Sequence, residues 1–279
     1  MIKDLTWKKT HVQIDLYRPF EGENEKNVMS WLTDTHIHLS DDEYSQDIPF
    51  IITSMEKIKI RACCVSVDLH TSEKTLDLSK ETKLVFPFVG IHPEKASDDL
   101  DPIVELIEKN SSQITGIGEI GLDKTYVSSQ EGFKRQETVF HKMLSIAEKL
   151  HKPVSIHSRS TLEEILSILP SYSISGVLLH WFAGNKKQLK ETMDLGCYVS
   201  YGPAMIYAKD KQVLLSETNS DKILVETDGP VRFSRCFAMK TAQITFLPSV
   251  VFCAAKVLKK TYDVLSYEIE QNSNRYLGV

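Results

Sequence analysis

Several features that mark other classes of protein are missing from this 279-residue sequence. No uninterrupted apolar run reaches the roughly 18 to 20 residues that a membrane span requires. The first residues, MIKDLTWKKTHVQIDLYRPF, lack the apolar core of a signal peptide. There are only five cysteines and no CxxC pair, which argues against a disulfide framework. We therefore expect a cytoplasmic protein without membrane contact.

A strong excess of basic residues is also absent. The net charge of −5 and the pI near 6.0 argue against a protein that coats nucleic acid through its whole surface, although they are compatible with a local basic cleft. A hydrophobic content of 42% and a charged content of 25% are typical of a soluble globular protein with a substantial core. The length fits two average domains or one α/β barrel.

Apolar strand-like runs alternate with helix-period segments from residue 31 onward, and this alternation predicts a parallel sheet with crossover helices. We count eight runs, at 31–38, 60–67, 84–90, 114–120, 153–158, 176–181, 196–201 and 222–227. The clearest helical pattern covers 130–150, and two more helices are expected at Pro248–Leu258 and Tyr262–Asn272. Eight such units predict a (β/α)8 TIM barrel. A doubly wound sheet is the alternative, but its glycine-rich turn is missing after the first strand.

No low-complexity linker divides the chain after residue 30. We therefore interpret residues 30–279 as one barrel domain, preceded by an N-terminal extension at residues 1–29. The extension is expected to contain an edge strand around His11–Tyr17 and then a polar loop. Its apolar residues suggest a patch that packs on the barrel or against a protein partner.

The segment LTDTHIHL at residues 32–39 is the first candidate for a metal site. In an extended strand, Asp34, His36 and His38 share one face, so the two imidazoles can converge on one ion. A strand that carries two ordinary hydrogen-bonded histidines is the alternative. The other strands decide between these interpretations, because the active sites of such barrels lie at the C-terminal ends of the strands.

Ionisable residues occur at the ends of five predicted strands. Each alone has a structural explanation, such as a helix cap or a turn. Together they supply four imidazoles and two carboxylates, more than one ion needs when it keeps a site for water, so two bridged ions are expected. Glu119 is the natural bridge, because it lies in the chain between the other ligands. The residues are His36, His38, Glu119, His157, His180 and Asp228.

The ordered blocks DTHIHLS, GIHPEKA, IGEIGLD, PVSIHSR, GVLLHWFAG and LVETDGP resemble those of the TatD-like metal-dependent deoxyribonucleases of the amidohydrolase superfamily. The resemblance runs from about Asp34 to the C-terminus. It implies one ion held by His36, His38, Glu119 and Asp228, and a second held by Glu119, His157 and His180. It also implies that Asp228 is the general base and that His92 and Arg159 contact the substrate phosphate. Asp228 and Glu119 are thus the expected catalytic residues.

Three features of the sequence depart from the pattern of this family. Trp181 stands where Cys is usual, and Pro203 follows Gly202 where a second Gly is usual. The stretch RFSRCFAMKTAQITFLP replaces an expected segment with Arg and Asn. These departures affect substrate contacts, whereas all expected metal ligands are retained.

Cations near the predicted strand ends favour a phosphodiester substrate, because a ring of them can hold a DNA backbone. They are Lys124, Arg159, Lys186, Lys187, Lys209, Lys211, Arg232 and Arg235. Arg159 is the strongest phosphate candidate because of its planar fork. Tyr126, Phe182 and Tyr201 are candidates for stacking on a terminal base.

We expect an exonuclease on single-stranded DNA ends that uses two divalent ions, Mg, Mn or Zn. One alternative is a metal-dependent amidohydrolase or lactonase for small molecules, although related barrels of that kind often bridge their ions with a carbamylated lysine. Another is a non-catalytic adaptor that uses the barrel for protein contacts. The retention of Asp228 and of every ligand argues against the adaptor.

Overall fold

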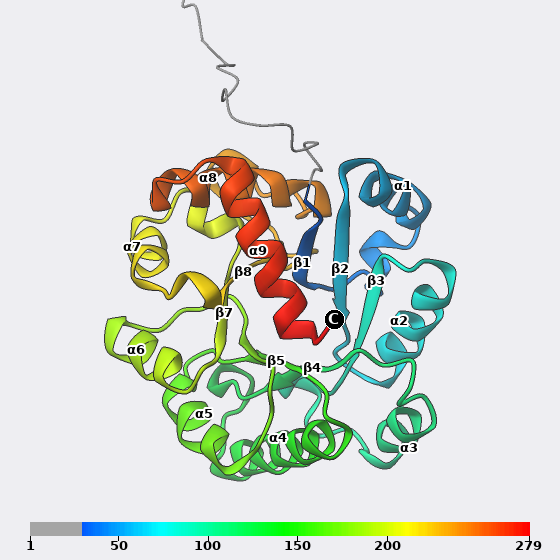
Figure 1. Cartoon of the computed structure of the whole chain (residues 1–279). Coiled ribbons are helices and arrows are strands. Elements are labelled where there is room, and N and C mark those ends of the chain that lie inside the picture. The colour runs from blue at the N-terminus through cyan, green and yellow to red at the C-terminus, as the bar shows by residue number, and fades with distance from the viewer. Residues whose placement is uncertain (1–29) are drawn as a thin grey trace, which may run out of the picture.

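Eight parallel strands lie side by side in chain order at the centre of the molecule (Figure 1). The computed structural model describes residues 30–279, so the expected extension at 1–29 and its edge strand lie outside the described residues. The last strand runs next to the first, where the backbone N–H of Asp228 donates to the carbonyl of His36 at 2.9 Å and that of His38 donates to Gly229 at 2.8 Å. The predicted (β/α)8 barrel is confirmed.

The strands are short and almost wholly buried, as expected for continuous apolar runs in a parallel sheet that is covered on both faces. Every one overlaps a run predicted from the sequence. Their bounds are β1 Leu32–Ile37, β2 Ile60–Val65, β3 Val85–Val89, β4 Gly116–Gly121, β5 Val154–His157, β6 Val177–Leu179, β7 Tyr198–Tyr201 and β8 Ile223–Val225.

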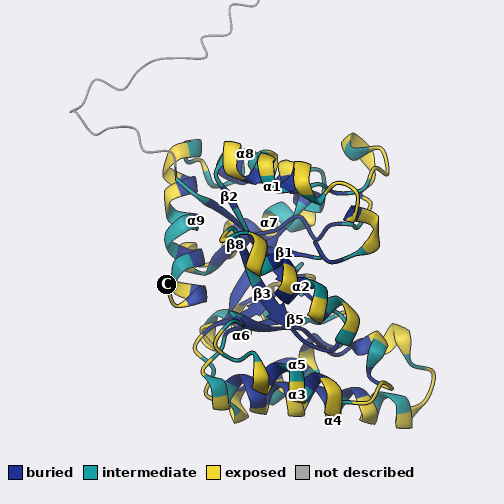
Figure 2. Ribbon diagram, turned by 90° about the vertical axis from the view of Figure 1, so that its right-hand side faces the viewer, coloured by how far each residue is buried: buried dark blue, intermediate teal, exposed yellow. Residues whose placement is uncertain are grey.

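Helices surround the barrel with their buried faces toward the strands and their exposed faces outward (Figure 2). The helix expected at 130–150 is confirmed as α4, and it begins where the Ser129 hydroxyl accepts a hydrogen bond from the Gly132 N–H at 3.1 Å. Among residues 30–279, no helix has both the length and the apolar character of a membrane span. The bounds are α1 Ile48–Ile58, α2 Leu69–Glu81, α3 Asp101–Lys109, α4 Gln130–Leu150, α5 Leu162–Ile168, α6 Lys186–Asp194, α7 Lys209–Glu217, α8 Leu247–Leu258 and α9 Tyr262–Leu277.

Helix α9 crosses the N-terminal end of the barrel (Figure 1). Tyr276 is fully buried there, its ring 5.6 Å from that of Tyr198, and its hydroxyl donates to the carbonyl of Val154 at 3.1 Å. Because Val154 and Tyr198 are the first residues of their strands, this helix closes that end of the barrel. The expected end of the helix at Asn272 was wrong, since the chain stays helical to Leu277 in order to bury Tyr276.

Candidate metal centre

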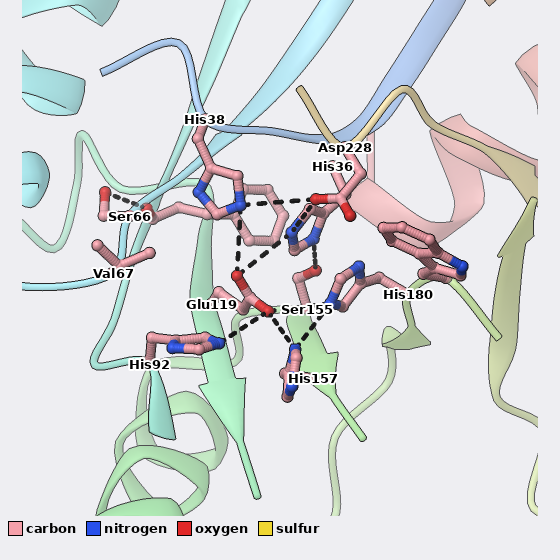
Figure 3. Close-up of polar contacts among 12 residues, drawn as sticks. His36, His38, Ser66, Val67, His92, Glu119, Ser155, His157, His180 and Asp228 are labelled. Carbon is pink, nitrogen blue, oxygen red and sulfur yellow. Dashed lines mark hydrogen bonds and ion pairs between the residues drawn. The ribbon is translucent and has the colours of Figure 1, made fainter. Parts of the chain in front are cut away.

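The six predicted ligands meet at the C-terminal end of the barrel (Figure 3). His36 lies near the end of β1 and His38 directly after it, and the Nε2 atom of each lies 3.4 Å from Oε2 of Glu119. Both Nε2 atoms also lie 3.7 Å from Oδ1 of Asp228, which follows β8. The ring of His36 is fixed from behind, because its Nδ1 lies 2.8 Å from the hydroxyl of Ser155. These four side chains can therefore surround one cation.

A second group lies on the other oxygen of Glu119. Nδ1 of His157, at the end of β5, and Nε2 of His180, after β6, each lie 2.9 Å from Oε1 of this carboxylate. Burial alone would raise the pKa of Glu119, but the surrounding imidazoles of His92, His180 and His36 outweigh it and hold that pKa well below the usual value. Glu119 is thus an anion whose two oxygens face two different sets of ligands.

His92, which was expected to contact the substrate phosphate, lies directly beside these ligand candidates. Its Nε2 is 3.6 Å from Oε1 of Glu119, and the side chain is 9% exposed. Nδ1 of His92 accepts the N–H of Glu94 at 3.2 Å, and burial lowers the pKa of the ring. Arg159, by contrast, is exposed in the loop after β5.

Asp123 is a functional candidate that the sequence reasoning missed. This fully buried carboxylate lies just after β4, with Oδ2 at 2.7 Å from Nε2 of His157. Its other oxygen, Oδ1, accepts bonds from the N–H and the hydroxyl of Thr125. Burial lowers the pKa of His157, but the bonds to Glu119 and Asp123 outweigh it and raise that pKa to about 9. A carboxylate behind a ligating histidine fixes its orientation and raises its basicity. The motif IGEIGLD contains Asp123 and was the available signal.

Glu226 was also missed, although it lies two residues before Asp228. It is fully buried, and its Oε1 accepts the N–H of Trp181 at 2.8 Å while Oε2 accepts the hydroxyl of Ser200 at 2.6 Å. The same Oε2 is 3.8 Å from Nδ1 of His180. Burial, and then the nearby charge of Asp228, raise the pKa of Glu226 well above the usual value. Glu226 therefore links the ends of three neighbouring strands beneath the ligands.

Asp34 has a different task from the two histidines of its strand. Its carboxylate accepts the N–H and the hydroxyl of Thr227 at 3.0 and 2.5 Å, and the N–H of His36 at 3.3 Å. Burial raises its pKa to about 7. Asp34 thus joins β1 to the segment that carries Asp228, which fixes the ligands of the two strands relative to one another.

The donor set fits divalent cations. It consists of imidazole nitrogens and carboxylate oxygens, which suit zinc and manganese. Nε2 of His36 and Nδ1 of His180 are buried without a hydrogen-bond partner. Such atoms raise the free energy of the fold unless a bound group contacts them. Three overlapping groups in the described chain bring ligand atoms within 4.8 Å of one another. They are His36–His180–Glu226, His36–His38–Glu119 and His92–Glu119–His157.

The expected contacts to a nucleic acid are only partly available. Phe182 and Tyr201 are buried, at 1% and 2% exposure, so their proposed stacking role was wrong, whereas Tyr126 is 47% exposed beside His92. Several of the expected cations are paired with carboxylates, which weakens the predicted ring. The pairs are Lys124 with Glu164, Lys186 with Glu217, Lys187 with Glu191 and Arg232 with Glu43.

Comparison with known proteins places this chain in a family. A Bacillus subtilis protein named as the uncharacterized metal-dependent hydrolase YabD is 26% identical over 255 residues, covering 89% of this chain and 99% of that protein. The Salmonella typhimurium 3′-5′ ssDNA/RNA exonuclease TatD is 26% identical over 214 residues, covering 72% and 80%. The crystal structure of the TatD homologue YjjV from Escherichia coli has the same fold, with a TM-score of 0.82 at 19% identity and coverage of 89% of this chain and 98% of that chain.

The match to the family itself extends over almost all of the described chain. The model of the family described as TatD related DNase matches residues 33–278, which include β1 apart from Leu32, all of α9 and every ligand candidate between them. The chain belongs to the TatD-related DNase family of metal-dependent hydrolases.

Proposed function

We propose that this protein is a two-metal-ion phosphodiesterase that removes nucleotides from single-stranded DNA ends. The observation that carries the proposal is the position of Glu119. One of its oxygens lies 3.4 Å from two imidazoles, and the other lies 2.9 Å from two more. Two ions that share this carboxylate would use both sets of imidazoles, which supports a centre with two ions.

Each ion has its own ligands in this proposal. His36, His38 and Asp228 hold the first with Glu119, and His157 and His180 hold the second with Glu119. When bound, such ions lower the pKa of a water molecule and stabilise the charge on the attacking and leaving oxygens. Asp228 takes the proton from the attacking water, since it lies at the mouth, 5% exposed, and is held by the turn after β8.

The substrate side of the proposal depends on the exposed residues around this centre. Arg159 is exposed two residues after His157, and a guanidinium binds phosphate oxygens through two parallel bonds. Tyr126 presents a ring beside His92 on which a base can stack. The Salmonella relative is named as an exonuclease on single-stranded DNA and RNA, which supports the same class of substrate here.

Metal analysis together with a nuclease assay tests this function. We expect two ions per chain, and release of mononucleotides from a single-stranded oligonucleotide that depends on added Mg, Mn or Zn. Glu119→Ala is expected to lower the occupancy of both ions, whereas His157→Ala lowers chiefly one. His70→Ala, on the exposed side of α2, is the matched control.

Two results would contradict the proposal in different ways. Loss of only one ion from Glu119→Ala would mean that another group bridges the metals. A fully loaded enzyme that hydrolyses small lactones or amides but no phosphodiester would favour the small-molecule alternative.

A further inference from the structure

An aromatic ladder begins beside a ligand candidate in the chain and runs across the loop between β8 and α8. Trp181 directly follows the ligand candidate His180, and its ring lies 5.2 Å from that of Phe233. Phe233 contacts Phe237 at 6.1 Å, and Phe237 contacts Phe246 at 4.8 Å, just before α8. One end of the ladder is therefore next to the proposed chemistry.

The backbone of Trp181 is held firmly in an unusual conformation. Its φ angle is +40°, in the left-handed region that large side chains rarely adopt. The N–H of Trp181 donates to Oε1 of Glu226 at 2.8 Å and also lies 3.2 Å from the hydroxyl of Ser200. Since Glu226 is wholly buried, this anchor fixes the backbone from which the indole projects.

The ladder is not simply a part of the hydrophobic core. Phe233 is 3% exposed and Phe182, the next residue after Trp181, is 1% exposed, so both are packing residues. Trp181 directly precedes Phe182 and its ring contacts that of Phe233, yet it is only half-buried. An indole that is backed on one side by a buried ring and is partly accessible at a catalytic mouth suits a stacking ligand.

We propose that Trp181 stacks on a nucleobase next to the scissile phosphate and is the residue that makes the enzyme prefer nucleotides to phosphodiesters without bases. This inference rests on the proposed function, since it assumes a nucleic-acid end at the metal centre. Stacking on an aromatic side chain is sequence-tolerant, because every base has a π-face. Trp181 would thus select for single-stranded ends, whose bases are free to leave the helical stack, without reading sequence.

Binding to a pair of matched strands tests this role. The full-length, zinc-loaded enzyme is titrated with an oligothymidine that carries phosphorothioate linkages, which resist hydrolysis, and with an abasic strand of the same length and charge. Wild-type protein is expected to bind the oligothymidine at least about tenfold more tightly than the abasic strand. Trp181→Leu is expected to lose this preference while its affinity for the abasic strand stays within about twofold.

Three further variants separate stacking from packing. Trp181→Phe keeps an aromatic face and should retain most of the preference, whereas Phe233→Leu removes the supporting ring and should lower it partly. Tyr267→Leu is the control, since Tyr267 is 59% exposed on α9 at the opposite end of the barrel. Circular dichroism and metal content show whether each variant is folded and loaded.

The outcomes distinguish this proposal from the proposed function. If Trp181→Leu keeps the preference for bases, or weakens binding of both strands equally, Trp181 is only a packing residue. A wild-type enzyme that cleaves DNA without any preference for bases would overturn the stacking role alone. An enzyme that binds bases through Trp181 but cleaves no phosphodiester would overturn the proposed function and leave this role in place.

Discussion

The two ends of the barrel are built from opposite kinds of residues. At the C-terminal end, buried side chains such as His36, Glu119 and Asp228 are ionisable and face one another. At the N-terminal end, Tyr276 and Leu277 of α9 pack into an apolar cluster with residues such as Phe88. Apolar packing lowers the free energy of the fold, whereas clustered ionisable groups raise it unless cations or protons compensate for them. The residues that stabilise the fold by apolar packing thus lie at one end of the barrel, and the candidate catalytic residues lie at the other.

The largest effect is expected at the apolar end. Tyr276→Ala removes a fully buried ring, so we expect it to lower the free energy of unfolding by about 3–5 kcal/mol. The rate per folded molecule should stay within threefold of wild type. Urea denaturation and an active-site titration measure the two quantities. Tyr276→Phe is the matched control, since it loses only the bond to Val154 and should cost about 1 kcal/mol. A rate that falls in proportion to stability would show that the two ends are coupled.

Asp228→Asn should have the reverse profile. The substitution keeps the volume of the side chain but removes the proposed proton acceptor and weakens the proposed first metal site, so turnover should fall by about 10² or more. The thermal unfolding midpoint of the metal-free protein should change little. Asp77→Asn, at an exposed position of α2, serves as the control. Activity within threefold of wild type would remove Asp228 from the mechanism.

Local patterns in the sequence were sufficient for the barrel and for the candidate ligands. Each strand is a short apolar run, and barrel topology carries the residue at the end of each run to the same mouth. His157 and His180 could thus be grouped with His36 without any knowledge of distances. Their grouping in the structure follows from the register of the strands.

What escaped prediction depends on contacts between residues far apart in the sequence. Asp123 reaches His157 across 34 positions, and Lys124 is paired with Glu164 across 40. Neither partner can be chosen from the sequence, because periodicity reports burial but not which polar groups meet. Helix α9 was expected to end at Asn272, yet the Asn272 amide is buried and donates to the carbonyl of Ile223 within a helix that continues to Leu277.

The pH dependence of the metal-free protein tests the charge balance at the polar end. The pKa of His157 is raised to about 9, so the stability that its charged form contributes is complete below about pH 6.5 and is lost as the pH rises through 9. We expect the free energy of unfolding to fall by an amount on the order of 1–3 kcal/mol between pH 7 and 9.5. Urea denaturation in the presence of a chelator measures this change. Asp123→Asn should reduce this fall, because it removes one of the two carboxylates that stabilise the charge.

The metal-loaded protein provides the contrast for this measurement. Ligating histidines must be neutral, so metal binding should release a proton from His157 near pH 7.5. Calorimetry in buffers of different ionisation enthalpy counts the released protons. The same pH-dependent fall in the loaded protein would mean that His157 is not a ligand.

The smallest effect is expected from removal of residues 1–29. Every ligand candidate, and the helix that closes the opposite end of the barrel, lies within residues 30–279. The residues that define the two ends of the barrel therefore do not include the extension. A chain that begins at Ser30 should keep two ions and a rate per folded molecule within a few fold of wild type. Metal content, the unfolding midpoint and the nuclease rate are measured on both chains. A lower midpoint or the loss of a protein partner fits an extension that packs outside the mouth. A truncated chain that is folded and metal-loaded but has lost its nuclease activity would show that residues 1–29 reach the active site. The polar end of the barrel would then include residues of the extension.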